Sequence, residues 1–310
     1  MPAYLVIPFV SLGLVVCWSS GYIGTQMAAD AGGDPFALFG WRFLFAALLC
    51  LALVAIVGRR PVWSPRAIGH ELVAGSLNVG VYLLAVVWAI QLGVSPAVTA
   101  LVTALQPLMA TLAMSLLRGE RIAPLGWAGS VLAAAGVVVC AAGEMRDVGG
   151  APAWAYLLPV VSAVTLTVGS LWSERAPRTL GSVERLLWQL AAAAVVFAVA
   201  VLVRTGELPA WPARDVQAWQ AIVFLVVLSS LGGYGFFNAS LRLRGVTYTS
   251  LMFYLTPPTT ALWAALQFGD RVGPSGWAGA VLVAAGVVLA LRALNRKSTI
   301  PPRCRRPASA

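Results

Sequence analysis

The sequence predicts an all-α integral membrane protein in which ten transmembrane helices form two inverted repeats of five helices each. Three observations carry this prediction: the composition, a series of apolar windows and an internal duplication. Of the 310 residues, 60% are hydrophobic and only 10% are charged. A soluble fold needs far more charge to cover its surface, so we expect the chain to cross a lipid bilayer many times.

The apolar windows are each close to 20 residues long, which is enough to cross a hydrocarbon core of about 30 Å at about 1.5 Å per residue. The first window lacks a preceding basic region and a clear cleavage site, so we expect it to be retained as the first helix. The short connections leave no room for a soluble domain. The ten expected helices lie near residues 5–27, 35–57, 69–91, 96–117, 123–143, 152–173, 184–203, 217–240, 246–267 and 275–293.

The duplication is clearest in the fifth and tenth expected helices. Residues 121–138 recur 150 positions later as residues 271–288, and 13 of the 18 positions are identical. Pro107 and Pro257 follow the same offset. Because each copy crosses the membrane an odd number of times, the second copy is inverted, a plan that recurs in transporters. The expected boundaries are 1–147 for the first repeat, 148–295 for the second repeat and 296–310 for a basic tail.

The basic residues predict the orientation of the chain. Sixteen of the arginines and lysines lie in the tail or in connections on one side, and four lie on the opposite side. The positive-inside rule therefore places both termini in the cytoplasm. This asymmetry also explains the net charge of +10 without a nucleic-acid partner. We expect the basic tail to anchor the topology or to contact anionic lipids.

Several stretches carry a family resemblance over nearly the whole chain. The first helix contains CWSSGYIGTQMA and the second contains LFGWRFLFAALL. The fourth contains LQPLMATLAMSLLRGER, echoed later as LTPPTTALWAALQFGDR, and the fifth contains GWAGSVLAAAGVVV. In these motifs the chain resembles EamA-type members of the drug/metabolite transporter superfamily. The resemblance implies a central cavity among helices one, three, four, six, eight and nine, with helices five and ten packed behind. The second copy departs from the pattern at Gln189, where a counterpart of Arg42 is expected.

Polar residues gather in the helices that are expected to surround the cavity. Asn78 and Tyr82 are four residues apart and so share a helical face, as do Tyr234 and Asn238 in the second copy. Polar groups that face hydrocarbon are costly, so these side chains must face the bundle interior. There they either line a solute site or only hydrogen-bond one helix to another. The expected solute-binding residues are Trp18, Arg42, Asn78, Tyr82, Thr103, Gln106, Ser230, Tyr234, Asn238, Tyr254 and Thr256.

Arg42 is the only basic residue well inside an expected span. An isolated arginine at membrane depth costs roughly 2.5–3.5 kcal/mol on insertion scales, so it must reach water or a partner. Two interpretations follow from the sequence. Arg42 either extends toward the outer interface, where Asp34 could pair with it, or meets a carboxylate of the solute.

Prolines occupy matching places in the fourth and ninth expected helices. Pro107 and the pair Pro257 and Pro258 each remove a backbone donor and free a carbonyl within a span. Interrupted helices at equivalent positions of two repeats often mark a solute site or a hinge. We expect hinges at these three prolines, and a kink tolerated for packing is the alternative.

The ionisable residues narrow the function. No Asp or Glu lies near the middle of an expected span, and the single Lys is in the tail. Phosphorylated solutes would need several Lys or Arg groups in the cavity, so a neutral, zwitterionic or weakly apolar solute is the better match. The four cysteines are scattered and have no histidine partner, so we expect no metal site, no cofactor and no enzymatic activity.

Together these features predict a secondary transporter. We expect it to export small organic metabolites, such as amino acids or related zwitterionic or apolar solutes, across the bacterial inner membrane by alternating access. The alternatives are multidrug efflux of lipophilic cations and a structural membrane protein without transport. The expected partners are the small-molecule solute and membrane lipids, with no nucleic acid, and the expected assembly is a monomer or a homodimer.

Overall fold

The computed structural model is helical in the residues that it describes, and it traces the ten membrane-spanning segments expected from the sequence. Seven helices in these residues are long and apolar enough to cross a bilayer. Large apolar side chains such as Ile56, Val203 and Leu266 are exposed along the helices, as expected for a surface that faces lipid. The described residues are 3–56, 64–94, 99, 102–103, 105–118, 122–142, 151–177, 179–212, 216–268 and 273–298.

The first half of the bundle contains five spans, and a short π-helix interrupts the third. The spans are α1 (Ala3–Asp30); α2 (Pro35–Ile56); α3 (Pro65–Gly75) with η1 (Ser76–Val81) and α4 (Tyr82–Gln91); a fourth span that ends in α6 (Gln106–Arg118); and α7 (Pro124–Ala142).

The second half repeats this order, with a π-helix in the equivalent third span. Its elements are η2 (Ala153–Tyr156), α8 (Leu157–Glu174), α9 (Ser182–Thr205), α10 (Val216–Phe224), η3 (Leu225–Gly233), α11 (Tyr234–Phe253), α12 (Thr256–Phe268) and α13 (Pro274–Ser298). Gly245 divides α11 between two spans, because its backbone takes a φ of 78° that side-chain-bearing residues avoid. The expected repeat boundary near residue 147 and residues 299–310 of the expected tail lie outside the described residues.

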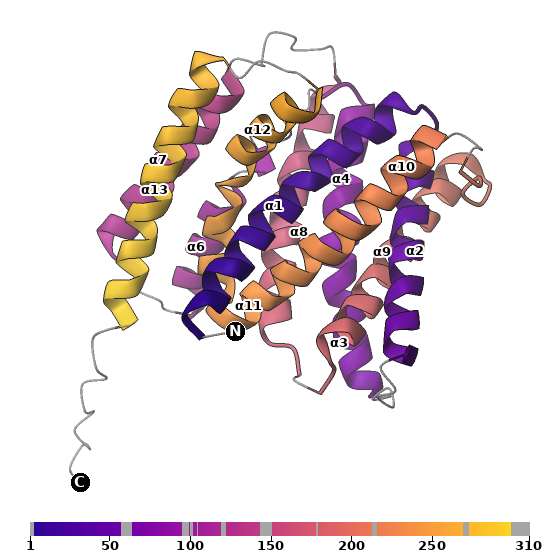
Figure 1. Ribbon diagram of the computed structural model, residues 1–310, viewed down its shortest axis with the longest axis horizontal. Coiled ribbons are helices and arrows are strands. Elements are labelled where there is room, and N and C mark those ends of the chain that lie inside the picture. The colour runs from indigo at the N-terminus through magenta and orange to yellow at the C-terminus, as the bar shows by residue number, and fades with distance from the viewer. Residues whose placement is uncertain are drawn as a thin grey trace.

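The two ends of the bundle are distinguished by where the helices begin. α1 starts and α13 ends at the lower side of Figure 1. We call this side the starting face, because α3 and α9 also begin there. α1 and α4 end, and α2 begins, at the opposite face.

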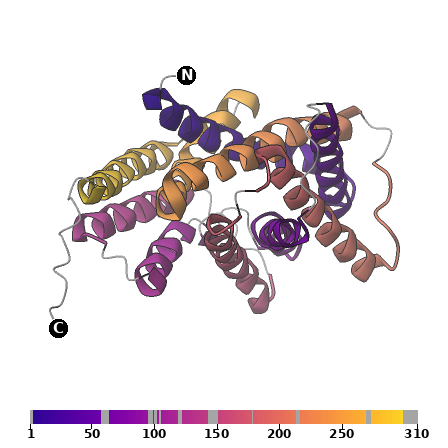
Figure 2. The same cartoon turned by 90° about the horizontal axis from the view of Figure 1, so that it is seen from below.

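The duplicated stretch forms a packing seam at one edge of the bundle. α7 and α13 lie side by side along their lengths in Figures 1 and 2. A β-carbon on Gly129 would lie 2.5 Å from the amide nitrogen of Ala290 and 2.6 Å from the carbonyl oxygen of Gly286. Small residues are needed at such a seam because close van der Waals packing holds helices together in lipid. On the other side of the bundle, α2 packs along α9.

The fourth and ninth spans are interrupted at equivalent places. α11 ends at Phe253 and α12 begins at Thr256, and in the first half α6 begins at the corresponding Gln106. The prolines Pro107, Pro257 and Pro258 therefore stand in the first turn of the following helix. A missing backbone donor costs little there, because the first N–H groups of a helix have no partner within it. The expected role of these prolines as hinges stays a prediction.

Substituting alanine for Gly129 tests the packing seam. We expect Gly129→Ala to destabilise the protein by about 1–3 kcal/mol, because the added methyl group meets backbone atoms that cannot rotate away. The measurement is the midpoint of thermal unfolding in detergent. Gly69→Ala in α3 is the matched control, since a β-carbon there meets no atom within 4 Å. Equal midpoints for the two variants would contradict the seam.

Candidate functional site

A cavity of about 90 Å³ lies between the two halves of the bundle. It contains residues from the ends of α1 and α4 and the start of α2, so it is nearer to the opposite face than to the starting face. A space of this size holds several water molecules or a small solute. The lining residues are Trp18, Gly21, Tyr22, Thr25, Phe39, Arg42, Tyr82, Leu83, Val86, Val87, Ile90, Thr99, Thr103, Ser229 and Tyr234.

Arg42 gives the cavity a buried positive charge. Its side chain is only 1% exposed. Its Nε donates to the Ser230 hydroxyl over 3.2 Å, and its Nη2 donates to the Ser229 hydroxyl over 2.9 Å. The guanidinium carbon also lies 4.8 Å from the ring centre of Phe39 and 4.6 Å from that of Phe43, within the range of cation–π attraction. Hydroxyl dipoles and ring faces therefore hold the charge in place.

Of the two interpretations of Arg42, the pairing with Asp34 is not what the structure shows. Asp34 instead accepts a bond from Arg204 over 3.3 Å at the bundle surface. Arg42 turns inward because Ser229 and Ser230 on η3 offer acceptors within the bundle. Within the described ranges, Arg42 forms no ion pair with a carboxylate. Among these residues its charge is stabilised by neutral hydroxyls and aromatic rings.

An aromatic cluster forms the wall of the cavity around Trp18. The Trp18 ring centre lies 6.2 Å from that of Tyr82 and 5.1 Å from that of Tyr234. The Phe253 ring is tilted by 42° relative to Trp18, with its centre 4.5 Å away. Tyr82 and Tyr234 occupy equivalent positions in the two repeats, so each half contributes one phenol to the same wall. The wall offers flat apolar surface together with hydroxyl groups.

Threonine hydroxyls supply the remaining polar groups. Thr25 donates to the Gly21 carbonyl over 2.7 Å, and Thr103 donates to the Thr99 carbonyl over 2.5 Å. The Thr99 hydroxyl is buried and has no hydrogen-bond partner among the described residues. An unpaired buried hydroxyl is costly, so this group is free to bond a polar molecule that enters the cavity.

Five of the eleven expected solute-binding residues line the cavity: Trp18, Arg42, Tyr82, Thr103 and Tyr234. The other six lie elsewhere and mostly bond helix to helix. Ser230 accepts from Arg42, Asn78 donates to Ser173 over 2.8 Å, and Gln106 donates to Ser250 over 3.2 Å. The remaining three are Asn238, bonded to Gln189; Tyr254, fully buried; and Thr256, whose carbonyl accepts from Ser19.

The expected polar stripes divide between the cavity and contacts between helices. Asn78 lies inside η1 and Tyr82 follows it, whereas Tyr234 and Asn238 both lie in α11. Ser230 lies inside η3 and Tyr234 follows it. Residues four apart share a helical face but lie about 6 Å apart along the axis, so one can reach the cavity while the other contacts a neighbouring helix. Neither π-helix has an evident sequence pattern.

Most of the lining residues that were not expected are apolar or small. On α1 they follow Trp18 on one helical face, at Gly21, Tyr22 and Thr25, and this spacing could have identified them. On α4 a similar face runs from Tyr82 to Ile90. Apolar residues at helical spacing give no sign of whether they face a cavity, another helix or lipid.

Two inverted halves with a cavity between them define the class of membrane transporters with internal repeats. A family model described as the EamA-like transporter family matches residues 5–142 and 153–292. The chain belongs to this family. It is therefore a multi-pass membrane protein of the drug/metabolite transporter superfamily, as its sequence motifs predict.

Similar proteins support the same class. The chain is 25% identical over 281 residues to the "Uncharacterized inner membrane transporter YedA" of Escherichia coli, covering 89% of this chain and 87% of that protein. It is also 25% identical over 288 residues to a "Probable terminal-alkyne amino-acid exporter" of Streptantibioticus cattleyicolor, covering 92% and 91% of the two chains. A crystal structure with 22% sequence identity shares the fold, with a TM-score of 0.77 over 94% of this chain and 98% of that one.

Removing both serine hydroxyls tests how Arg42 is held. We expect the double variant Ser229→Ala and Ser230→Ala to lose about 1–3 kcal/mol of stability, because a buried guanidinium is left without its acceptors. Thermal unfolding in detergent measures the loss. Adding Arg42→Met to this variant is expected to recover part of the stability, since the unpaired charge is then gone. No recovery would mean that the serines act independently of Arg42.

Proposed function

We propose that this chain exports a small solute that carries a carboxylate, such as an amino acid, across the bacterial inner membrane. The observation that carries the proposal is Arg42, a buried cation in the cavity that hydroxyls and aromatic rings hold among the described residues. A carboxylate beside it would form a charge-assisted, two-pronged hydrogen bond in a poorly solvated site. The similarity to a probable amino-acid exporter is consistent with this solute class.

The cavity also favours a small solute with an apolar part. A volume of about 90 Å³ suits a compact molecule, and Trp18, Tyr82 and Tyr234 offer ring surface for its hydrocarbon portion. A single arginine provides fewer donors than a phosphate group requires. Phosphorylated sugars and nucleotides therefore fit this cavity less well than amino acids do.

Efflux of lipophilic cations is the second candidate function, since the aromatic wall could attract a cation through its ring faces. Arg42 opposes it. Two unit charges about 4 Å apart repel each other by about 4 kcal/mol at an effective dielectric constant of 20, compared with about 0.5–2 kcal/mol for one cation–π contact. The repulsion is the larger effect, so we rank cations below carboxylates.

The proposed orientation has both termini in the cytoplasm, in keeping with the excess of basic residues at the starting face. In this orientation the cavity lies in the outer half of the membrane. The chain would then be in its outward-facing state, and transport would proceed by alternating access between the two halves.

Ligand-dependent thermal unfolding tests the solute class. A solute that binds only the folded protein at a hundredfold excess over its Kd stabilises it by about 2.7 kcal/mol. We expect free amino acids to raise the unfolding temperature and the corresponding amino-acid amides, which lack the carboxylate, to leave it unchanged. Arg42→Gln is expected to remove the response. Stabilisation by lipophilic cations alone would favour the second candidate, and stabilisation by sugar phosphates alone would overturn the proposal.

Truncation of the two tyrosines tests the cavity as the transport site. We expect Tyr82→Ala and Tyr234→Ala each to lower amino-acid flux in proteoliposomes by about tenfold or more, because each removes buried contact surface. Membrane insertion should be unchanged. Trp154→Ala, in the exposed turn η2, is the control for loss of an aromatic side chain. Normal flux in both tyrosine variants would place the solute elsewhere.

A further inference from the structure

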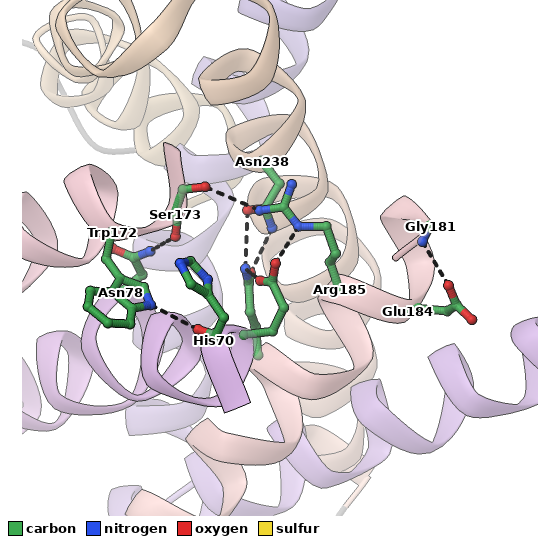
Figure 3. A network of polar contacts seen from close by, with 10 residues as sticks. His70, Asn78, Trp172, Ser173, Gly181, Glu184, Arg185 and Asn238 are labelled. Atoms are coloured by element: carbon green, nitrogen blue, oxygen red, sulfur yellow. Dashed lines mark hydrogen bonds and ion pairs between the residues drawn. The ribbon is translucent and has the colours of Figure 1, made fainter. Parts of the chain in front are cut away.

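A second set of buried polar groups lies near the starting face, away from the cavity. Glu71 of α3 and Arg185 of α9 form an ion pair over 2.7 Å, and their side chains are 1% and 4% exposed. The other oxygen of Glu71 accepts from Gln189 over 2.6 Å. Figure 3 shows this network of polar contacts, which joins helices from both sequence repeats.

Asn238 brings a third helix, α11, into this network. Its amide nitrogen donates to the Gln189 side-chain oxygen over 2.7 Å, and its amide oxygen accepts from the Gln189 nitrogen over 3.3 Å. The two amides are thus bonded in both directions. We call Glu71, Arg185, Gln189 and Asn238 the amide lock.

The contacts within the amide lock differ in kind. α3 and α9 are close-packed, because Gly75 of α3 lies directly against the Gln189 backbone and leaves no room for a β-carbon. α11 packs mainly along α1 and meets α9 over a short stretch only. The hydrogen bonds between Asn238 and Gln189 therefore join α11, which packs along α1, to the close-packed pair of α3 and α9. The ion pair between Glu71 and Arg185 lies within the pair of α3 and α9.

The amide lock stands between the cavity and the starting face. Tyr82 and Tyr234 line the cavity, and the residues four positions nearer the starting face on the same spans are Asn78 and Asn238. Asn78 is tied to Ser173, and Asn238 is tied to Gln189. A solute that moves between the cavity and the starting face along these spans must break the hydrogen bonds of Asn78 or of Asn238.

The amide–amide hydrogen bonds of the amide lock suit a contact that breaks and re-forms. Separated amides regain hydrogen bonds from water, so opening costs only the small net difference between protein and water partners. A wholly apolar seal would instead expose hydrocarbon to water when it opened. The ion-paired Glu71 accepts from Gln189 and so holds it in position. The Gln189 amide can therefore bond Asn238 again after the two have separated.

We propose that the amide lock is the cytoplasmic gate of this transporter, and that the path opens to the cytoplasm when Asn238 separates from Gln189. This inference rests on the proposed transport function and on the proposed orientation. Asn238 and Gln189 set the balance between the outward-facing and inward-facing states. Glu71 and Arg185 act through Gln189 as positioning residues.

Thiol labelling measures the gate without any solute. The background replaces the four native cysteines by alanine and carries Thr103→Cys in the cavity as the reporter. Inverted membrane vesicles expose the cytoplasmic side to a membrane-impermeant maleimide. We expect Asn238→Ala to raise the labelling rate from this side by about tenfold, which corresponds to about 1.4 kcal/mol lost from the closed state.

Ser240→Ala is the matched control. Ser240 lies two residues from Asn238 and is also buried, but its hydroxyl bonds over 2.8 Å to Thr249, on the next span beyond Gly245, and not to α9. We expect this variant to label like the background. Equal labelling of Asn238→Ala and Ser240→Ala, in folded protein, would overturn the gate. Because the readout needs no solute, the gate and the transport function can fail separately.

A cross-link keeps the proposal testable if Asn238→Ala does not fold. Gln189→Cys and Asn238→Cys together place two thiols across the lock, and a short bis-thiol reagent joins them. We expect cross-linked protein to keep its thermal response to amino acids and to lose flux, and we expect a reagent with a reducible spacer to restore flux on reduction. Undiminished flux after complete cross-linking would contradict the gate. Loss of the thermal response alone would count against the proposed solute instead.

Discussion

The structure depends on the absence of water from the hydrocarbon core, because every polar group placed there needs a partner within the protein. Arg42 is held by Ser229 and Ser230, and Glu71 is held by Arg185. Both sets of contacts join helices from different repeats. An isolated charge at membrane depth costs a few kcal/mol, so these contacts fix where the two halves meet, beside the cavity and near the starting face.

The two repeats share an architecture but differ in the groups that they place at equivalent points. α2 carries Arg42, which faces the cavity, whereas the equivalent helix α9 carries Gln189, which faces Asn238. A guanidinium keeps its charge at any working pH and attracts an anion. An amide is neutral and forms weaker, reciprocal bonds. The symmetric scaffold therefore carries a buried cation at the cavity and a neutral pair of amides near the starting face.

Local irregularities also occur in pairs. The π-helices η1 and η3 interrupt equivalent spans, and the breaks before Gln106 and Thr256 interrupt another equivalent pair. π-turns and broken helices within membranes often accompany function, since they free backbone groups and rotate side chains relative to the regular helix. Tyr82 and Tyr234, which directly follow the two π-helices, line the cavity, whereas Asn78 within η1 donates to Ser173.

The sequence alone determined the ten spans and the inverted repeat, because hydrophobic length and duplication can be recognised without the tertiary structure. The packing of α7 against α13 was implied by the family resemblance. The sequence also identified Arg42, Tyr82 and Tyr234 as interior groups, since polar side chains in lipid-length helices must face inward. Only the tertiary structure decided which polar residues share the cavity and which, like Asn238, bind another helix. That choice depends on helix rotation and on partners more than 40 residues away in the chain, neither of which is encoded in local spacing.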